Sequence, residues 1–75
     1  MMTVLARFRQ AAEDNWPEDE ARASAEAFLA YAQSDGMDYA QGWLGREISH
    51  WEKEFSTAEM QRWHRRFQQL TESTP

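Results

Sequence analysis

The apolar positions of this chain fall into stretches that have the spacing of α-helix faces. The clearest stretch is FSTAEMQRWHRRFQQL at residues 55–70. Its apolar residues are three, four and three positions apart: Met60, Trp63, Phe67 and Leu70. That spacing is typical of a helix that packs against another helix. Ser56 and Glu59 match a capping box, and Phe55 before it can form a hydrophobic staple with Met60. The pattern predicts a helix over residues 57–71 that follows a tight corner.

Residues 17–34 predict a second helix, which begins with a proline and three acids. Pro17 suits the first turn of a helix, and the helix dipole favours negative charge at the next positions. Those acids are Glu18, Asp19 and Glu20. The apolar face is mostly alanine and consists of Ala21, Ala25, Phe28, Leu29 and Ala32. Gly36 is a typical stop signal. An alanine face lets a neighbouring helix come close.

Residues 38–54 predict a third helix, with Asp38 as its N-cap. Its apolar face contains Ala40, Leu44, Ile48 and Trp51 and leads to Phe55. Gly42 and Gly45 are unfavourable here, because each costs about 1 kcal/mol relative to alanine. Three explanations are open: close packing against another backbone, a helix that begins only after Gly42, or room for a ligand or partner. We favour close packing.

Residues 3–13 predict one more short helix, because Val4, Leu5, Phe8 and Ala12 share one face. The predicted fold is therefore all-α, a small compact bundle of about four short helices at 3–13, 17–34, 38–54 and 57–71. Seventy-five residues allow a single domain. We expect residues 1–75 to form it, with a frayed tail at 72–75.

The composition narrows the class of protein. The chain has no cysteine, which excludes disulfides and thiolate metal sites and fits the cytosol. No stretch approaches the ~20 apolar residues of a membrane span. The N-terminus lacks the apolar core of a signal peptide. We expect a cytoplasmic protein with no membrane span.

The net charge of −5 lies entirely in the first half of the chain. Residues 1–38 hold eight acids and three bases, whereas residues 39–75 hold five of each. The acids are densest in EDNWPEDE at residues 13–20. An acidic chain is poorly suited to neutralising nucleic-acid phosphates, and an acidic patch attracts a basic partner. The charge therefore favours a protein partner with a basic surface over nucleic acid.

A basic cluster on the 57–71 helix is the exception. Arg62, Arg65 and Arg66 fall within about 100° of arc, away from the apolar face. A DNA-recognition helix would have such a face, but the tight corner at Ser56 leaves no room for the usual turn. Glu59 can also pair with Arg62. We interpret this face chiefly as solvated surface, with a protein partner or nucleic acid as alternatives.

Candidate catalytic and metal-binding motifs are weak. Glu47 and His50 have the Glu-x-x-His spacing of di-iron bundles, but such a site needs two of these motifs and two further glutamates. A homodimer and Glu26 could supply part of that set. The sequence also has no phosphate loop and no nucleophile elbow. We expect no enzyme activity, metal or cofactor.

These observations predict a non-enzymatic, small, acidic, protein-binding regulator. By analogy of size and charge alone, it could be a phage- or plasmid-encoded inhibitor of a nucleic-acid-handling machine, of the anti-CRISPR or DNA-mimic type. The alternatives are a DNA-binding regulator that uses the arginines, and a structural homo-oligomerisation module such as a homodimer. The candidate partner-binding residues are Glu13, Asp14, Trp16, Glu18, Asp19, Glu20, Glu26, Trp43, Arg62, Arg65 and Arg66.

Overall fold

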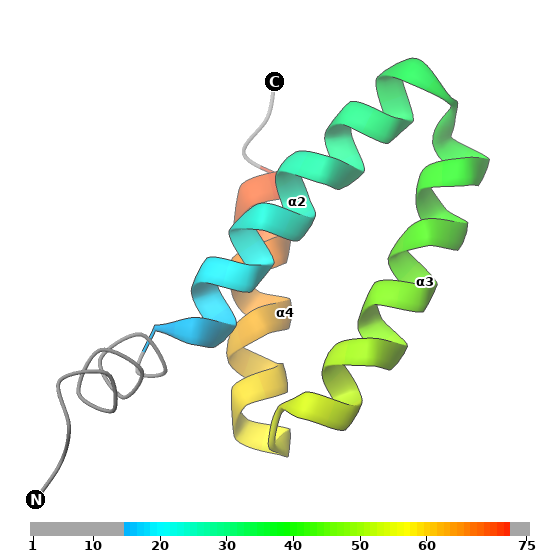
Figure 1. Cartoon of the computed structure of the whole chain (residues 1–75). Helices are drawn as coiled ribbons and strands as arrows, with labels where there is room; N and C mark the ends of the chain where they lie inside the picture. The colour runs from blue at the N-terminus through cyan, green and yellow to red at the C-terminus, as the bar shows by residue number, and fades with distance from the viewer. Residues whose placement is uncertain (1–14, 73–75) are drawn as a thin grey trace, which may run out of the picture.

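A computed structural model describes residues 15–72, which form three helices and no strand (Figure 1). The helices are α2 (Trp16–Ser34), α3 (Met37–Glu54) and α4 (Thr57–Glu72). The all-α prediction is confirmed, with three helices in this part of the chain. The helix expected at residues 3–13 lies outside the described residues. Glu72, which was expected in the tail, belongs to α4.

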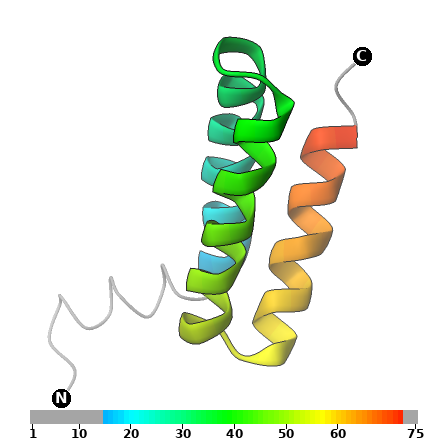
Figure 2. The same ribbon diagram turned by 90° about the vertical axis from the view of Figure 1, so that its right-hand side faces the viewer.

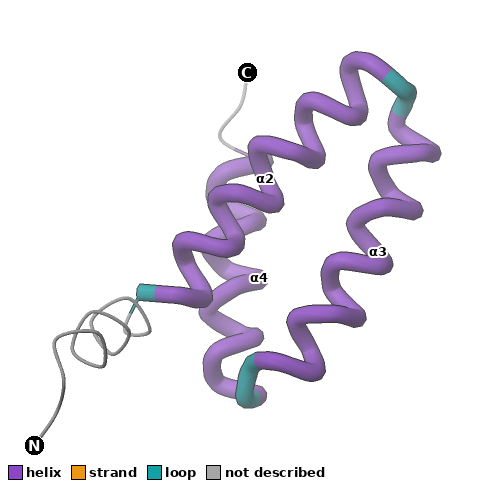
Figure 3. The backbone as a smooth tube through the Cα atoms, in the orientation of Figure 1, coloured by secondary structure: helices purple, strands orange, loops and turns teal. Residues whose placement is uncertain are grey.

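The two connections between the helices are short (Figure 3). α2 and α3 run in opposite directions and form a hairpin. α4 reverses direction again and lies alongside α2, running in the same general direction as α2 (Figure 1). The view turned by 90° shows α4 beside the hairpin (Figure 2). α4 packs mainly against α2 and contacts α3 far less. α2 is therefore the helix that the other two share.

The turn between α2 and α3 depends on Gly36. The N–H of Asp35 donates to the carbonyl of Tyr31 at 2.7 Å and closes α2. Gly36 then has a φ of +96°, a conformation that favours glycine. Gly36 also holds the N-cap position of α3. The prediction that Asp38 is the N-cap is wrong: Asp38 lies in the first turn, where its charge still complements the helix dipole.

The corner between α3 and α4 has the predicted capping box. The backbone N–H of Ser56 donates to Glu59 Oε1 at 2.8 Å, and the N–H of Glu59 donates to Ser56 Oγ at 3.2 Å. The backbone N–H of Ser56, and secondly its hydroxyl, lower the pKa of the Glu59 carboxylate. Phe55 and Met60, the predicted staple, are both buried in the same cluster. The corner is therefore fixed on its polar and its apolar side.

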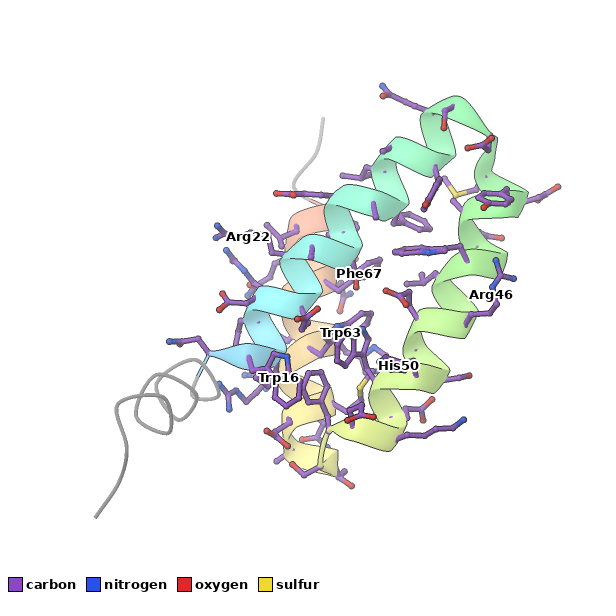
Figure 4. All side chains as sticks on the ribbon, viewed as in Figure 1. Trp16, Arg22, Arg46, His50, Trp63 and Phe67 are labelled. Carbon is purple, nitrogen blue, oxygen red and sulfur yellow. The ribbon has the colours of Figure 1, made fainter. Side chains whose placement is uncertain are left out.

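The core is centred on Trp63, which is fully buried. It clusters with Ala21, Phe55 and Met60. Half-buried apolar residues surround this cluster: Trp16, Leu44, Ile48, Trp51 and Phe67. Trp63 stacks on Phe67 with ring centroids 5.1 Å apart, and Figure 4 shows both side chains on α4. All three helices thus contribute to one core, although Ala21 is the only member of the apolar face predicted for α2 that belongs to the cluster.

Gly42 and Gly45 have a different environment from the expected one. A Cβ at Gly42 would meet only the end of Arg46, at 3.9 Å, and one at Gly45 would meet no side chain or neighbouring helix of residues 15–72 within 4 Å. The favoured explanation, close packing, is therefore wrong. A late helix start is also wrong, because α3 begins at Met37. Of the three explanations, room for a ligand or partner remains.

Candidate binding surfaces

Three rings form an aromatic surface near the α2–α3 turn, which we define as Tyr31, Tyr39 and Trp43. The ring of Tyr31 lies 5.3 Å from that of Tyr39 and 5.3 Å from that of Trp43, centroid to centroid. Tyr39 is 47% exposed, and Trp43 is half-buried. Met37 is 50% exposed. Large apolar area therefore remains open to solvent at this end of the hairpin.

Gly42 belongs to the same face of α3 as these rings. Tyr39, Gly42, Trp43 and Arg46 are separated by three, one and three positions, so they share one helical face. The bare backbone at Gly42 consequently lies beside the two aromatic residues, next to the end of the Arg46 side chain. A partner can approach the backbone of α3 closely here, as it can at Gly45.

The hairpin segment that carries the aromatic surface is acidic. Residues 26–54 contain six acids and two bases, a net charge of −4. Five of the acids are exposed and Glu47 is half-buried. Candidate residue Glu26 is among the exposed acids. The segment therefore carries open aromatic area and a net negative charge, with Asp35 and Asp38 as the acids at the α2–α3 turn itself.

A second surface lies between α2 and α4, and we call it the arginine groove. It encloses about 450 Å³ and is lined by Asn15, Glu18, Asp19, Arg22, Arg62, Arg65, Arg66 and Gln69. Figure 4 shows Arg22 projecting from α2 on the side away from α3. The groove brings together five of the candidate partner-binding residues, which are Glu18 and Asp19 of α2 and Arg62, Arg65 and Arg66 of α4.

Glu18 and Arg62 form an ion pair within this groove. Arg62 Nε donates to Glu18 Oε1 at 2.7 Å, and Arg62 Nη2 donates to Glu18 Oε2 at 2.8 Å. These bonds lower the pKa of Glu18, and the nearby charges of Arg62 and Arg66 act in the same direction. The predicted partner of Arg62 was Glu59; the structure shows Glu18 as a partner on another helix. Glu18 is thus engaged within the protein.

The other candidate residues are divided among different surroundings. Trp16 packs at the edge of the core, with ring centroids 5.0 Å from Phe55 and 6.1 Å from Trp51. Its Nε1 donates to Glu20 at 3.3 Å. Glu13 and Asp14 lie outside the described residues. The described acids at the start of α2 therefore do not form one uniform acidic face.

Sequence reasoning missed Arg22 in the groove and Tyr31 in the aromatic surface. The i, i+4 spacing of Glu18 and Arg22 places both on one face of α2. The sequence does not reveal that α4 brings its arginines to that same face. The pairing of Tyr31 with α3 likewise depends on how α2 and α3 cross.

Within the part of the chain that the structure describes, Glu47 and His50 have no further potential metal ligands grouped with them. Among residues 15–72, no group of three or more His, Cys, Asp or Glu residues is placed to hold a metal ion. None of the three helices there is long and apolar enough to cross a membrane.

No protein-family model matches the chain, and no match is found among curated proteins or among solved structures. The two surfaces are therefore the features of this protein that indicate a function. They differ in chemistry: the aromatic surface lies on an acidic hairpin, whereas the groove between α2 and α4 is rich in arginine.

Proposed function

We propose that the protein is a non-enzymatic protein-binding regulator and that a partner with a basic surface docks on its aromatic surface. The observation that carries this proposal is the open ring of Tyr39, held against Tyr31 beside Trp43. Tyrosine and tryptophan are enriched among the residues that dominate binding energy. Rings that are already packed together also lose little conformational freedom on binding.

Charge supports a basic partner. The hairpin residues 26–54 carry a net charge of −4. Opposite charges around an apolar centre accelerate association and suppress wrong partners. A basic protein would therefore be steered to the hairpin, where its apolar groups could cover Tyr39 and Trp43.

Gly42 supports a close approach at the same place. A helical glycine costs about 1 kcal/mol relative to alanine, and no internal packing at Gly42 offsets this cost. Glycine allows another molecule to come near the backbone. A partner side chain that packs beside Tyr39 and Trp43 would use this space.

The class of partner follows from its charge. Proteins that handle nucleic acids present basic surfaces, and an acidic protein that covers such a surface inhibits them. We therefore retain inhibition of a nucleic-acid-handling machine, of the anti-CRISPR or DNA-mimic type, as the proposed role. This last step rests on analogy of size and charge. The cytoplasmic location stays a prediction.

Pulldown from a bacterial lysate treated with nuclease tests the proposal when it includes matched variants. Tyr39→Ser removes the exposed ring, and Gly42→Gln fills the open space with a good helix former. Gln41→Ser is the control, because Gln41 is exposed on α3 outside the Tyr39 face. We expect a stoichiometric basic partner that the control retains and both other variants lose.

Two results would contradict the proposed function. One is a partner that binds all four proteins equally. The other is self-association of the wild type, seen by analytical ultracentrifugation and abolished by Tyr39→Ser. The latter would instead support the homo-oligomerisation alternative.

A further inference from the structure

The arginine groove has a charge opposite to that of the whole chain. Four guanidinium groups face it, one from α2 and three from α4, together with the carboxylates of Glu18 and Asp19. The lining therefore carries a net charge of +2, while the chain carries −5. The proposed partner surface on the hairpin does not use this groove.

The internal ion pair leaves most of this positive charge available. Arg62 donates two hydrogen bonds, one to each carboxylate oxygen of Glu18. Among residues 15–72, Arg22 and Arg65 form no ion pair or side-chain hydrogen bond. Arg66 makes one long hydrogen bond, 3.4 Å, to Gln69 Oε1. Arg22, Arg65 and Arg66 therefore keep most of their donors for a ligand.

The chemistry of these side chains selects the ligand. Like charges gathered in one groove repel each other, so an anion that binds between them relieves that repulsion. The planar guanidinium donates two parallel hydrogen bonds to oxyanions such as phosphate. Guanidinium groups from two helices can hold different oxygens of the same ligand.

We propose that the arginine groove binds the phosphate groups of a small molecule of nucleotide size, held by Arg22, Arg65 and Arg66. Its volume of about 450 Å³ lies within the usual range for small-molecule pockets, about 300–1,000 Å³. The amides of Asn15 and Gln69, which also line the groove, provide further hydrogen-bonding groups.

The charge distribution disfavours a long nucleic acid in the same groove. Duplex binding requires basic side chains along an extended track of phosphates. Here the basic cluster is bounded by Asp19 within the groove, and the hairpin residues 26–54 carry −4. A compact anion meets the arginines without passing along these acids.

Chemical-shift titration of the ¹⁵N-labelled full chain at low salt tests the proposal. The probes are inorganic phosphate, pyrophosphate, AMP and ATP, with a short DNA duplex as the competing class. We expect ATP to shift amides of residues 15–22 and 62–69 and to leave α3 unchanged. Comparison of pyrophosphate with ATP separates a free polyphosphate from a nucleotide as the source of the phosphates.

Variants localise the binding. Arg22→Ala combined with Arg65→Ala is expected to weaken ATP binding by about 100-fold, because removing each charge-assisted arginine–phosphate interaction weakens binding by about tenfold. Arg46→Ala is the matched control, because Arg46 is exposed on α3 and projects away from the groove (Figure 4). It should change the affinity by less than about twofold, since distant exposed charges are screened.

Arg65→Lys tests the hydrogen-bonding geometry of the arginine without removing its positive charge. Lysine keeps the positive charge but lacks the two-point fork of arginine, so we expect weaker binding with unchanged melting. The proposal is overturned if no phosphate compound shifts the groove amides or if Arg46→Ala weakens binding as much as the groove variants. Stronger binding to the duplex than to ATP would also overturn it. None of these results depends on the protein partner proposed for the hairpin.

Discussion

Glu18 and Arg62 are 44 positions apart in the sequence, and two hydrogen bonds of 2.7 and 2.8 Å join their side chains. The pair connects the first turn of α2 to α4. Both side chains are partly exposed, Arg62 by 40% and Glu18 by 33%, so the pair contributes only about 0.2–1 kcal/mol to stability. The apolar contact of Trp63 with Ala21 dominates the packing of α4 on α2, and the ion pair joins the two helices at the groove beside it.

Stability should fall in acid because of this pair. Arg62 lowers the pKa of Glu18 below its ordinary value of 4.5, so the unfolded chain binds the proton more tightly. The contribution is therefore present above about pH 4.5 and is lost as the pH falls through the lower, folded-state pKa. Melting temperatures measured across this range should fall less steeply for Glu18→Gln than for the wild type. Equal slopes would show that the pair is not formed in solution.

Removal of the Trp63 side chain should be the most damaging single truncation. Trp63→Ala leaves a cavity at a fully buried position, which costs about 3–5 kcal/mol. Tyr39→Ala is the comparison, because this ring is 47% exposed and its loss should cost much less. Urea denaturation followed by circular dichroism measures both free energies of unfolding. Similar losses for the two variants would argue against Trp63 as the centre of the core.

Loss of the capping box at the α3–α4 corner should have a moderate effect. Ser56→Ala removes the hydroxyl that accepts from the Glu59 N–H and should cost about 1 kcal/mol. Ser56→Thr keeps a hydroxyl and is the control. Both are measured by thermal unfolding, and a lower melting temperature for Ser56→Thr than for Ser56→Ala would contradict the capping role.

Two glycines should respond to alanine with opposite signs. Gly45→Ala adds a methyl group in open space and should stabilise the protein by about 1 kcal/mol. Gly36→Ala places a Cβ at a φ of +96° and should destabilise it, because side chains rarely tolerate that conformation. Melting temperatures of both variants and the wild type, measured under the same conditions, test these two expectations. Destabilisation by Gly45→Ala would mean that the outer face of α3 is packed in solution.

Local signals in the sequence were sufficient to place the three described helices. Pro17, Gly36 and the Ser56–Glu59 box each act within a few residues, and the predicted helix ends differ from the observed ones by one residue at most. Asp38 was misassigned because the positive φ of Gly36 makes that glycine the helix boundary. Glycine and aspartate both occur at N-cap positions, so residue type alone does not decide between Gly36 and Asp38.

The surfaces could be predicted only in part. Periodicity placed Arg62, Arg65 and Arg66 on one face of α4, but it gave no information on which helix lies opposite. Glu18 and Arg22 therefore joined them unexpectedly. The sequence shows that Gly42 and Gly45 are unusual positions in α3. Whether another helix packs against them depends on how the three helices are arranged. The side on which each arginine lies follows from one helix, whereas the residues opposite it depend on the packing of two.

The three glycines also differ in how evolution can act on them. Selection for folding alone maintains Gly36, because its positive φ leaves few replacements. The same selection acts against Gly42 and Gly45, because alanine would fit in the open space and improve the helix. A descendant lineage that loses the proposed partner should therefore replace Gly42 and Gly45 soon while keeping Gly36. If distantly related sequences keep all three glycines, this would indicate that contact with another molecule has been under selection.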